Sequence, residues 1–207
     1  MDTTRLAELL GPFAPNDVLT SPLLQQLQRY LDLLLRWNQR VNLTAVRDPE
    51  TIVTRHFGES LFAARVLLPT RATLIVADIG SGAGFPGIPM KLFAPGIELT
   101  LIESQNKKAV FLREVVRTLG LDHVDVFPGR AEQWGRTANL VTLRAVERFE
   151  RALSVAVKLV ADNGQLGLLI GGGQVPAAQQ ALGGWVWREP VLVPQSEARV
   201  ILAGKRR

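Results

Sequence analysis

An acidic residue followed by three alternating glycines is the part of the chain with the clearest capacity for chemistry. Asp78 follows the apolar run 74–77, and Gly80, Gly82 and Gly84 come soon after it. Glycine permits positive φ and lets bare backbone approach a ligand closely. An apolar run that ends in such a turn is typical of a buried parallel strand. The segment therefore predicts a site for a nucleotide-like ligand at the end of a strand.

The spacing of the glycines separates the classes of nucleotide-binding protein. A dinucleotide fingerprint needs glycine at the first, third and sixth positions, and the sixth position counted from Gly80 is Phe85. A P-loop is excluded because no Gly-Lys-Ser/Thr follows. The Asp-x-Gly-x-Gly-x-Gly arrangement resembles the first motif of Rossmann-like methyltransferases that use S-adenosylmethionine. That cofactor carries an amino group and a sulfonium but no pyrophosphate, so a carboxylate near the turn can face its cation through ordered water or backbone.

Two later segments fit the same cofactor. Glu103 ends the next expected strand, where an acid can hold ribose hydroxyls, and Arg130-Ala131-Glu132 follows the third strand, where such enzymes contact the adenine. The structural alternative is an ordinary glycine turn and an ordinary acid at a strand end. The resemblance predicts ten cofactor-binding residues: Asp78, Gly80, Ser81, Gly82, Gly84, Phe85, Glu103, Ser104, Ala131 and Glu132.

The elements that must hold these residues follow from the pattern of apolar residues. Residues 1–68 are expected to be helical, with one helix from Ser21-Pro22 to Trp37 and another that starts at Asp48-Pro49. From residue 74 onward, short β-rich runs alternate with helical ones. The expected strands are 74–79, 98–103, 123–127, 140–143, 165–170, 185–193 and 198–202, and the expected helices are 87–93, 105–119, 149–159 and 176–182.

This alternation predicts an α/β fold, a parallel sheet with helices on both faces, and the resemblance of the glycine motif implies that it is of the Rossmann-like, class I methyltransferase type. The sheet is expected to have seven mostly parallel strands and to end in an antiparallel edge hairpin, because no helix separates the last two strands. Residues 1–68 would form an N-terminal helical cap. Residues 69–207 would form the methyltransferase core, and the two parts are expected to make one compact unit.

Composition and charge exclude several other classes of protein. The chain has 207 residues, 47% of them hydrophobic, and no cysteine, which rules out a disulfide scaffold and a cysteine-ligated zinc site. No apolar run is long enough to span a bilayer. The net charge of +5 and the pI of about 10.2 favour a polyanionic partner, with nucleic acid ahead of a membrane surface. The alternative is a solvated surface that is merely rich in arginine.

The residues that follow the glycines narrow the resemblance to one family. With its continuation Phe85-Pro86-Gly87-Ile88-Pro89, the loop closely resembles that of the glucose-inhibited division protein B family, the bacterial 16S ribosomal RNA guanine-N7 methyltransferases. Glu59 stands where the family usually has aspartate, and Ile170 stands where a lysine beside glycine is expected. Matching segments run from about residue 30 to 150: Trp37-Asn38, Val41-Asn42-Leu43-Thr44, Arg47-Asp48-Pro49, His56 with Glu59-Ser60, and Thr142-Leu143-Arg144-Ala145-Val146, with a shorter match near Arg199.

The resemblance implies methyl transfer from S-adenosylmethionine to N7 of a guanine in 16S rRNA. This nitrogen has a lone pair and no proton, so the reaction needs positioning rather than a general base. Arg144, after the fourth strand, is the predicted catalytic residue and also a substrate-binding residue, and Arg130, Arg199 and His56 are the other predicted substrate-binding residues. Two alternatives stay open: Arg144 could form an ion pair with Glu147 or Glu150, and His56 could be a helix-packing residue.

The resemblance also predicts the partners and the setting of the protein. The expected partner is 16S rRNA or the small ribosomal subunit, and the expected location is the bacterial cytoplasm. A monomer is expected, without membrane association, and without a metal because His56 and His123 show no metal-ligand spacing. The alternatives are a methyltransferase with a small-molecule or protein substrate, and a noncatalytic RNA-binding module.

Overall fold

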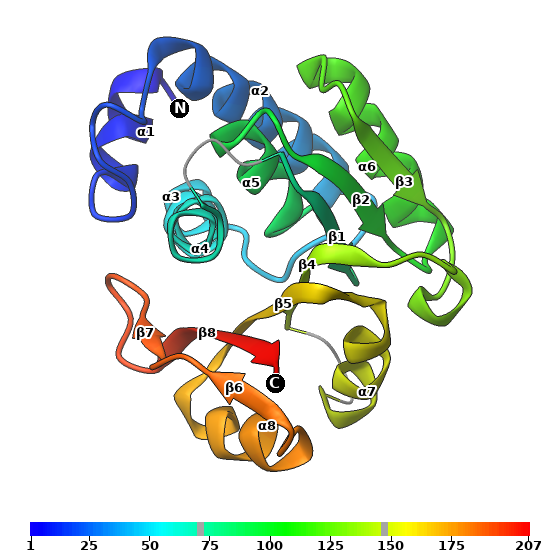
Figure 1. The fold of residues 1–207 in the computed structure, drawn as a ribbon. Coiled ribbons are helices and arrows are strands. Elements are labelled where there is room, and N and C mark those ends of the chain that lie inside the picture. The colour runs from blue at the N-terminus through cyan, green and yellow to red at the C-terminus, as the bar shows by residue number, and fades with distance from the viewer. Residues whose placement is uncertain (70–72, 146–148) are drawn as a thin grey trace.

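A computed structural model describes residues 1–69, 73–145 and 149–207. An eight-stranded sheet forms its centre, with the order β3-β2-β1-β4-β5-β8-β6 and with β7 paired to β8 (Figure 1). The strands are β1 (Ile75–Ile79), β2 (Glu98–Ile102), β3 (Val124–Phe127), β4 (Ala138–Arg144), β5 (Val160–Gly171), β6 (Trp185–Trp187), β7 (Val191–Leu192) and β8 (Arg199–Arg206).

Helices cover both faces of this sheet (Figure 1). The α-helices are α1 (Thr3–Leu10), α2 (Ser21–Asn38), α3 (Pro49–Ile52), α4 (Glu59–Leu67), α5 (Gly87–Phe93), α6 (Asn106–Leu119), α7 (Phe149–Leu159) and α8 (Val175–Ala181). The described residues also form a π-helix η1 (Val53–Gly58) and the 3₁₀ turns η2 (Ala131–Gln133) and η3 (Gly172–Gln174). The α-helices before residue 120 pack on one face of the sheet, and α7 and α8 pack on the other.

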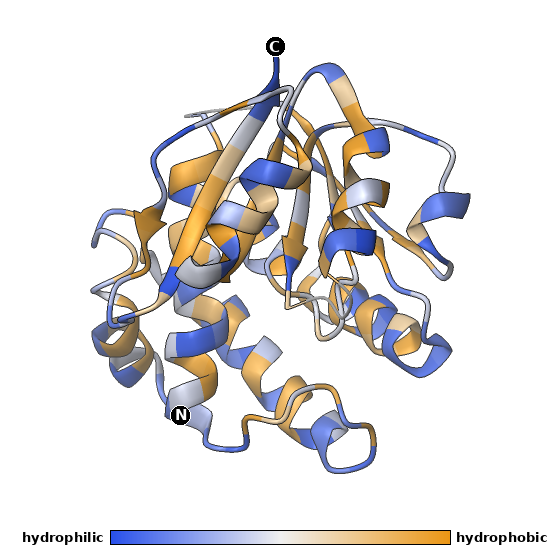
Figure 2. Ribbon diagram, turned by 90° about the horizontal axis from the view of Figure 1, so that it is seen from below, coloured by the Kyte–Doolittle hydropathy of each residue, from blue (hydrophilic) through white to orange (hydrophobic). Residues whose placement is uncertain are grey.

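Alternate residues of each central strand supply these two hydrophobic cores. In β1, Val76 packs among the N-terminal helices, whereas Ala77 and Ile79 pack toward α7. In β4, Leu140 packs in the core with the N-terminal helices and Val141 packs in the core with α7. This is expected, because successive side chains of a strand point to opposite faces. The hydropathy colouring of Figure 2 shows the matching pattern in the helices, whose apolar and polar residues lie on different sides.

The C-terminal hairpin differs in detail from the sequence prediction. The expected strand 185–193 is split into β6 and β7, so the sheet has eight strands rather than seven. Pro190 lies in the break, where a residue without an N–H cannot continue a hydrogen-bonded ladder. β8 is antiparallel to β5 and lies between β5 and β6, so the chain's last strand is inserted inside the sheet.

The predicted cap of residues 1–68 packs directly on the sheet. Its residues Leu27 and Phe57 belong to the same buried core as Val76 of β1 and Phe111 of α6. The division at residue 68 stays a prediction, because the core runs continuously across it. Within the described residues, no helix is long and apolar enough to cross a membrane.

Candidate functional site

A cavity of about 470 Å³ lies where β1 and β2 end. The carboxyl ends of parallel strands gather ligands in open α/β sheets, and the strand order reverses between β1 and β4, which is the usual crevice. Lys108 and Arg151 also line this cavity, and the sequence pattern did not single out Arg151. Seven of the residues named from the sequence line it: Gly80, Gly82, Glu103, Ser104, Arg130, Ala131 and Glu132.

Helix α2 contacts the glycine loop that borders this cavity. Gly80, Gly82 and Gly84 all have positive φ, of 67°, 57° and 92°. The hydroxyl of Tyr30, from α2, donates a hydrogen bond to the carbonyl of Ala83 in this loop. A Cβ at Gly84 would collide with that same hydroxyl, so glycine is required there by space as well as by φ.

Glu103 ties the end of β2 to the glycine loop. Its Oε2 accepts the backbone N–H of Gly82 at 2.9 Å, and its Oε1 accepts that of Gln105 at 2.7 Å. Each carboxylate oxygen can accept a further hydrogen bond, and Glu103 lines the cavity. The acid is therefore fixed in place and still has acceptor capacity for a ligand.

Asp78 does not line the cavity, so any part it plays in cofactor binding would be indirect, through ordered water or backbone as the sequence pattern predicted, and this stays a prediction. Its side chain is fully buried: Oδ1 accepts the Thr142 hydroxyl at 2.7 Å, and Oδ2 accepts the backbone N–H of Gly87 at 3.3 Å. Its carbonyl oxygen accepts the Ser81 hydroxyl at 2.8 Å. Asp78 thus braces the loop from below, and Ser81 is buried with it.

Burial raises the pKa of Asp78 from 3.8 to about 6, although its hydrogen bonds oppose the shift. The folded protein therefore binds this proton more tightly than the unfolded chain does. The stability that this group contributes is full below about pH 4 and is lost as the pH rises through about 6.

We expect Asp78→Asn to remove this pH dependence. Between pH 4.5 and pH 8, the free energy of unfolding of the wild type should fall by about 2 kcal/mol relative to that of the variant. Urea unfolding at the two pH values measures the difference. Asp125→Asn is the matched control, because Asp125 is exposed on β3. Parallel pH curves for the wild type and Asp78→Asn would contradict the assignment.

A second cavity, of about 220 Å³, lies beside the first. Ala145, which has a φ of 48° at the end of β4, lines both cavities. Three arginines and one acid supply the charged part of its lining: Arg55, Arg144, Arg199 and Glu59. Ile170 gives it an apolar wall at the position where the family resemblance had suggested a lysine. The two cavities therefore meet at Ala145.

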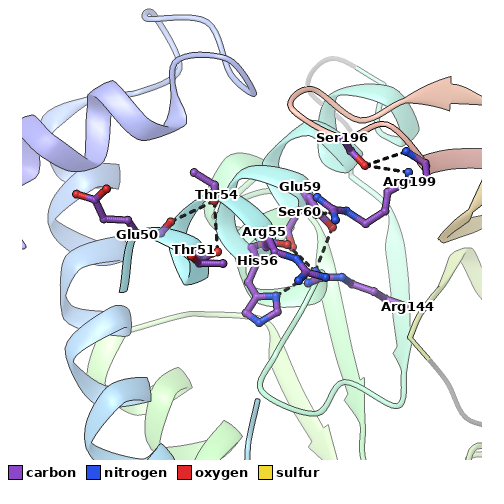
Figure 3. Close-up of polar contacts among 11 residues, drawn as sticks. Glu50, Thr51, Thr54, Arg55, His56, Glu59, Ser60, Arg144, Ser196 and Arg199 are labelled. Atoms are coloured by element: carbon purple, nitrogen blue, oxygen red, sulfur yellow. Dashed lines mark hydrogen bonds and ion pairs between the residues drawn. The ribbon is translucent and has the colours of Figure 1, made fainter. Parts of the chain in front are cut away.

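Arg144 lines this second cavity. Its side chain points toward Arg55 and His56 of η1 and Glu59 of α4 (Figure 3). Its Nη2 donates to the carbonyl of Arg55 at 2.6 Å and is 3.0 Å from Nδ1 of His56. The same nitrogen is 3.1 Å from Oε2 of Glu59. Glu59 is thus its acidic partner among the described residues, rather than the nearby Glu150 that had been an alternative; Glu147 lies outside the described residues.

His56 is a half-buried support for Arg144 and not a lining residue of either cavity. Because a guanidinium only donates, Nδ1 of His56 must accept from Arg144, so Nε2 carries the proton and donates to the Thr44 hydroxyl at 2.8 Å. Burial, followed by the charge of Arg144, lowers the pKa of His56 to about 3. His56 is therefore neutral, and both ring nitrogens are engaged.

Phe85 connects the glycine loop to this group. Its ring stacks on His56 at 5.0 Å and on Tyr30 at 5.5 Å, and the guanidinium of Arg144 lies 5.8 Å from its centroid. Phe85 and Gly84 therefore lie outside the lining of the first cavity. The glycine loop therefore borders the first cavity, and its Phe85 ring supports His56 and Arg144 beside the second cavity.

The segment after α2 presents Thr44 to His56. Oδ1 of Asn38 accepts the backbone N–H groups of Leu43 and Thr44 at 2.9 and 3.1 Å, and Arg47 donates to the carbonyl of Asn38 at 2.8 Å. These are residues of the N-terminal signature noted in the sequence. In the structure, this signature fixes the turn that presents Thr44 to His56.

Glu59 is the site residue that sequence reasoning missed. It lies in the first turn of α4, is 3% exposed, and contacts both Arg144 and Arg199 (Figure 3). The available signal was its position with His56 and Ser60 in one of the segments that resemble the family. Arg130, predicted with Arg144 and Arg199, lines the first cavity instead. Within the described ranges, no group of His, Asp and Glu could hold a metal ion.

Comparisons with known proteins place this arrangement in context. A family model described as rRNA small subunit methyltransferase G (GidB) matches residues 23–181. The ribosomal RNA small subunit methyltransferase G of Chloroflexus aggregans is 42% identical over 192 residues, covering 86% of this chain and 79% of that protein. The protein of the same name from Stenotrophomonas maltophilia (strain K279a) is 40% identical over 193 residues, covering 91% and 86%.

Solved structures share the fold at much lower identity. A ribosomal protein L11 methylase from Lactobacillus delbrueckii subsp. bulgaricus has a TM-score of 0.62 at 16% identity, covering 74% of this chain and 79% of that one. TYW2 of P. horikoshii, solved in complex with MeSAdo, has a TM-score of 0.58 at 14% identity, covering 72% and 61%. Both support the Rossmann-like methyltransferase fold.

Proposed function

Because the chain belongs to the rRNA small subunit methyltransferase G family, we propose that it transfers a methyl group from S-adenosylmethionine to N7 of a guanine in 16S rRNA. The observation that carries the proposal is the pair of cavities that meet at Ala145. One has a glycine loop and a strand-end acid, as a nucleoside-bearing cofactor requires. The other has arginines beside a carboxylate, as a guanine requires.

The first cavity suits S-adenosylmethionine, which supplies an electrophilic methyl group when it is bound. Its volume of about 470 Å³ lies within the roughly 300–1,000 Å³ that is typical of ligand pockets. Glu103 has acceptor capacity for ribose hydroxyls, and backbone at Gly80 and Gly82 is open to close approach. Ser104, Ala131 and Glu132 would complete the contacts, and Asp78 would act by bracing the loop.

The residues of the second cavity suit an acceptor that needs no deprotonation. Guanine N7 carries a free lone pair, so methyl transfer requires that it be aimed at the methyl group and held there. His56 cannot serve as a base, because its pKa is low and both of its nitrogens are engaged. Arg144 and Arg199 can donate to guanine O6 or to a phosphate, which orients the base without blocking N7.

A modification map tests this function. We expect 7-methylguanosine at one position of 16S rRNA in cells that contain the protein and its loss from cells that lack it, measured by mass spectrometry. Purified protein with labelled S-adenosylmethionine should label 16S rRNA or small subunits. Label in protein alone would favour a protein methyltransferase, and no binding of S-adenosylmethionine by calorimetry would favour a noncatalytic RNA-binding module. We further propose that the protein acts as a monomer in the cytoplasm.

A further inference from the structure

We propose that Glu59 and Arg199 together distinguish guanine from adenine in the second cavity. Glu59 would accept hydrogen bonds from N1–H and the 2-amino group of guanine, and Arg199 would donate to O6. This inference rests on the proposed function, because it takes guanine as the acceptor. It assigns base recognition to a pair of residues that come from α4 and β8.

The first observation is that a buried acceptor and a buried donor lie together as an ion pair and have no other polar partner among the described residues. Oε1 of Glu59 and Nε of Arg199 are 2.5 Å apart, so they form an ion pair. Both atoms are buried, and apart from this ion pair neither has a hydrogen-bond partner among the described residues. A buried polar atom without a hydrogen bond is costly and needs an explanation. A ligand that presents a donor to one atom and an acceptor to the other would remove the cost.

The second observation is that this pair of atoms has the polarity of guanine. Guanine presents the O6 acceptor beside the N1–H donor, followed by the 2-amino donor. Arg199 Nε beside Glu59 Oε1 presents a donor beside an acceptor, which is the complement. Adenine reverses both positions, since it has an amino donor at C6 and an unprotonated N1. Adenine would therefore place a donor against the guanidinium and a lone pair against the carboxylate.

The third observation is the placement of the pair relative to the first cavity. Glu59 and Arg199 line the second cavity only, whereas Ala145 lines both. The 2-amino group and N7 lie at opposite ends of a purine. A guanine whose 2-amino group points to Glu59 therefore directs N7 away from that residue, which is the orientation that transfer from the first cavity requires.

The carboxylate is also held firmly before any base enters. Its Oε2 is 3.1 Å from Nη2 of Arg144, and that nitrogen is in turn fixed by the carbonyl of Arg55 and by His56. Arg199 is steadied at its backbone, where its N–H donates to the Ser196 hydroxyl at 2.9 Å (Figure 3). A preorganised acceptor of this kind discriminates strongly, because it cannot turn away from a mismatched base.

A chemical double-mutant cycle tests the inference. The two enzymes are the wild type and Glu59→Gln, which keeps the size of the side chain and removes its charge. The two substrates are small subunits whose 16S rRNA carries either guanosine or inosine at the mapped target, introduced by ligating a synthetic segment. Inosine differs from guanosine only by lacking the 2-amino group, so N7, O6 and N1–H are unchanged.

For the wild type, we expect kcat/KM on inosine to be about 10- to 100-fold lower than on guanosine, as for a lost hydrogen bond to a charged group. For Glu59→Gln, this ratio should fall to within about threefold, because the charged acceptor that reads the amino group is gone. A purely structural role for Glu59 would lower activity on both substrates equally and would leave the ratio unchanged, which would overturn the inference.

Controls separate the possible failures. Glu50→Gln makes the same chemical change in an exposed ion pair with Arg5, and it should retain the wild-type ratio. Affinity for S-adenosylmethionine, measured by calorimetry, should be unchanged in Glu59→Gln if the variant is folded. If it does not fold, Glu59→Asp keeps the carboxylate and should keep most of the discrimination. Equal wild-type rates on guanosine and inosine overturn the inference alone, whereas no methylation of guanosine overturns the proposed function as well.

Discussion

Arg144→Ala will lower kcat for methyl transfer by about 100-fold or more and will leave the affinity for S-adenosylmethionine close to that of the wild type. Arg144 contacts the second cavity and not the first, so its loss affects the acceptor and spares the cofactor. It also leaves Glu59 without one of its two guanidinium partners. Misplacement of a reacting group by about 1 Å is enough to cost on the order of 100-fold.

Single-turnover transfer to small subunits measures the rate of methyl transfer, and calorimetry measures the affinity for S-adenosylmethionine. Arg136→Ala is the matched control, because Arg136 is exposed and lies over Trp134, away from both cavities. Arg144→Lys should recover little activity, since an ammonium cannot reproduce the contacts of a planar guanidinium with Arg55, His56 and Glu59. A loss of cofactor affinity as large as the loss of rate would contradict the separation of the two cavities.

Glu103→Ala should weaken binding of S-adenosylmethionine by about 10- to 100-fold. The change removes an acceptor from the cavity and leaves the N–H groups of Gly82 and Gln105 without their partner. A hydrogen bond to a charged group is worth about 1.5–3 kcal/mol, which corresponds to this range. Glu98→Ala, at the exposed start of the same strand, is the control and should bind normally. Unchanged affinity in Glu103→Ala would exclude this acid from the cofactor site.

The sheet and the first cavity were predictable because they depend on local pattern. A buried strand, a glycine turn and a strand-end acid are consecutive in the chain, and parallel topology brings the ends of β1 and β2 together. The direction of the Asp78 side chain was not predictable. β1 is buried on both faces, so its periodicity does not say which side faces the ligand.

The second cavity depends on contacts that are distant in sequence. Glu59, Arg144 and Arg199 come from a helix and two strands, and no spacing rule relates them. The π-helical turn η1 adds to the difficulty, because it widens the helix and shifts the register of Arg55 and His56 relative to α4. Only the packed structure reveals that these side chains meet.

The insertion of β8 between β5 and β6 has a consequence for the order in which the protein acquires its activities. The residues that line the first cavity, from Ile79 to Val155, are all synthesised before β8. Arg199, Val200 and Ile201, which β8 contributes to the second cavity, come later. If the first cavity holds the methyl donor and the second the acceptor, as we propose, a nascent chain contains every group for its donor while it still lacks the chamber for its acceptor. On this proposal, it would gain the ability to select an RNA base only once β8 has left the exit tunnel of the ribosome that makes it.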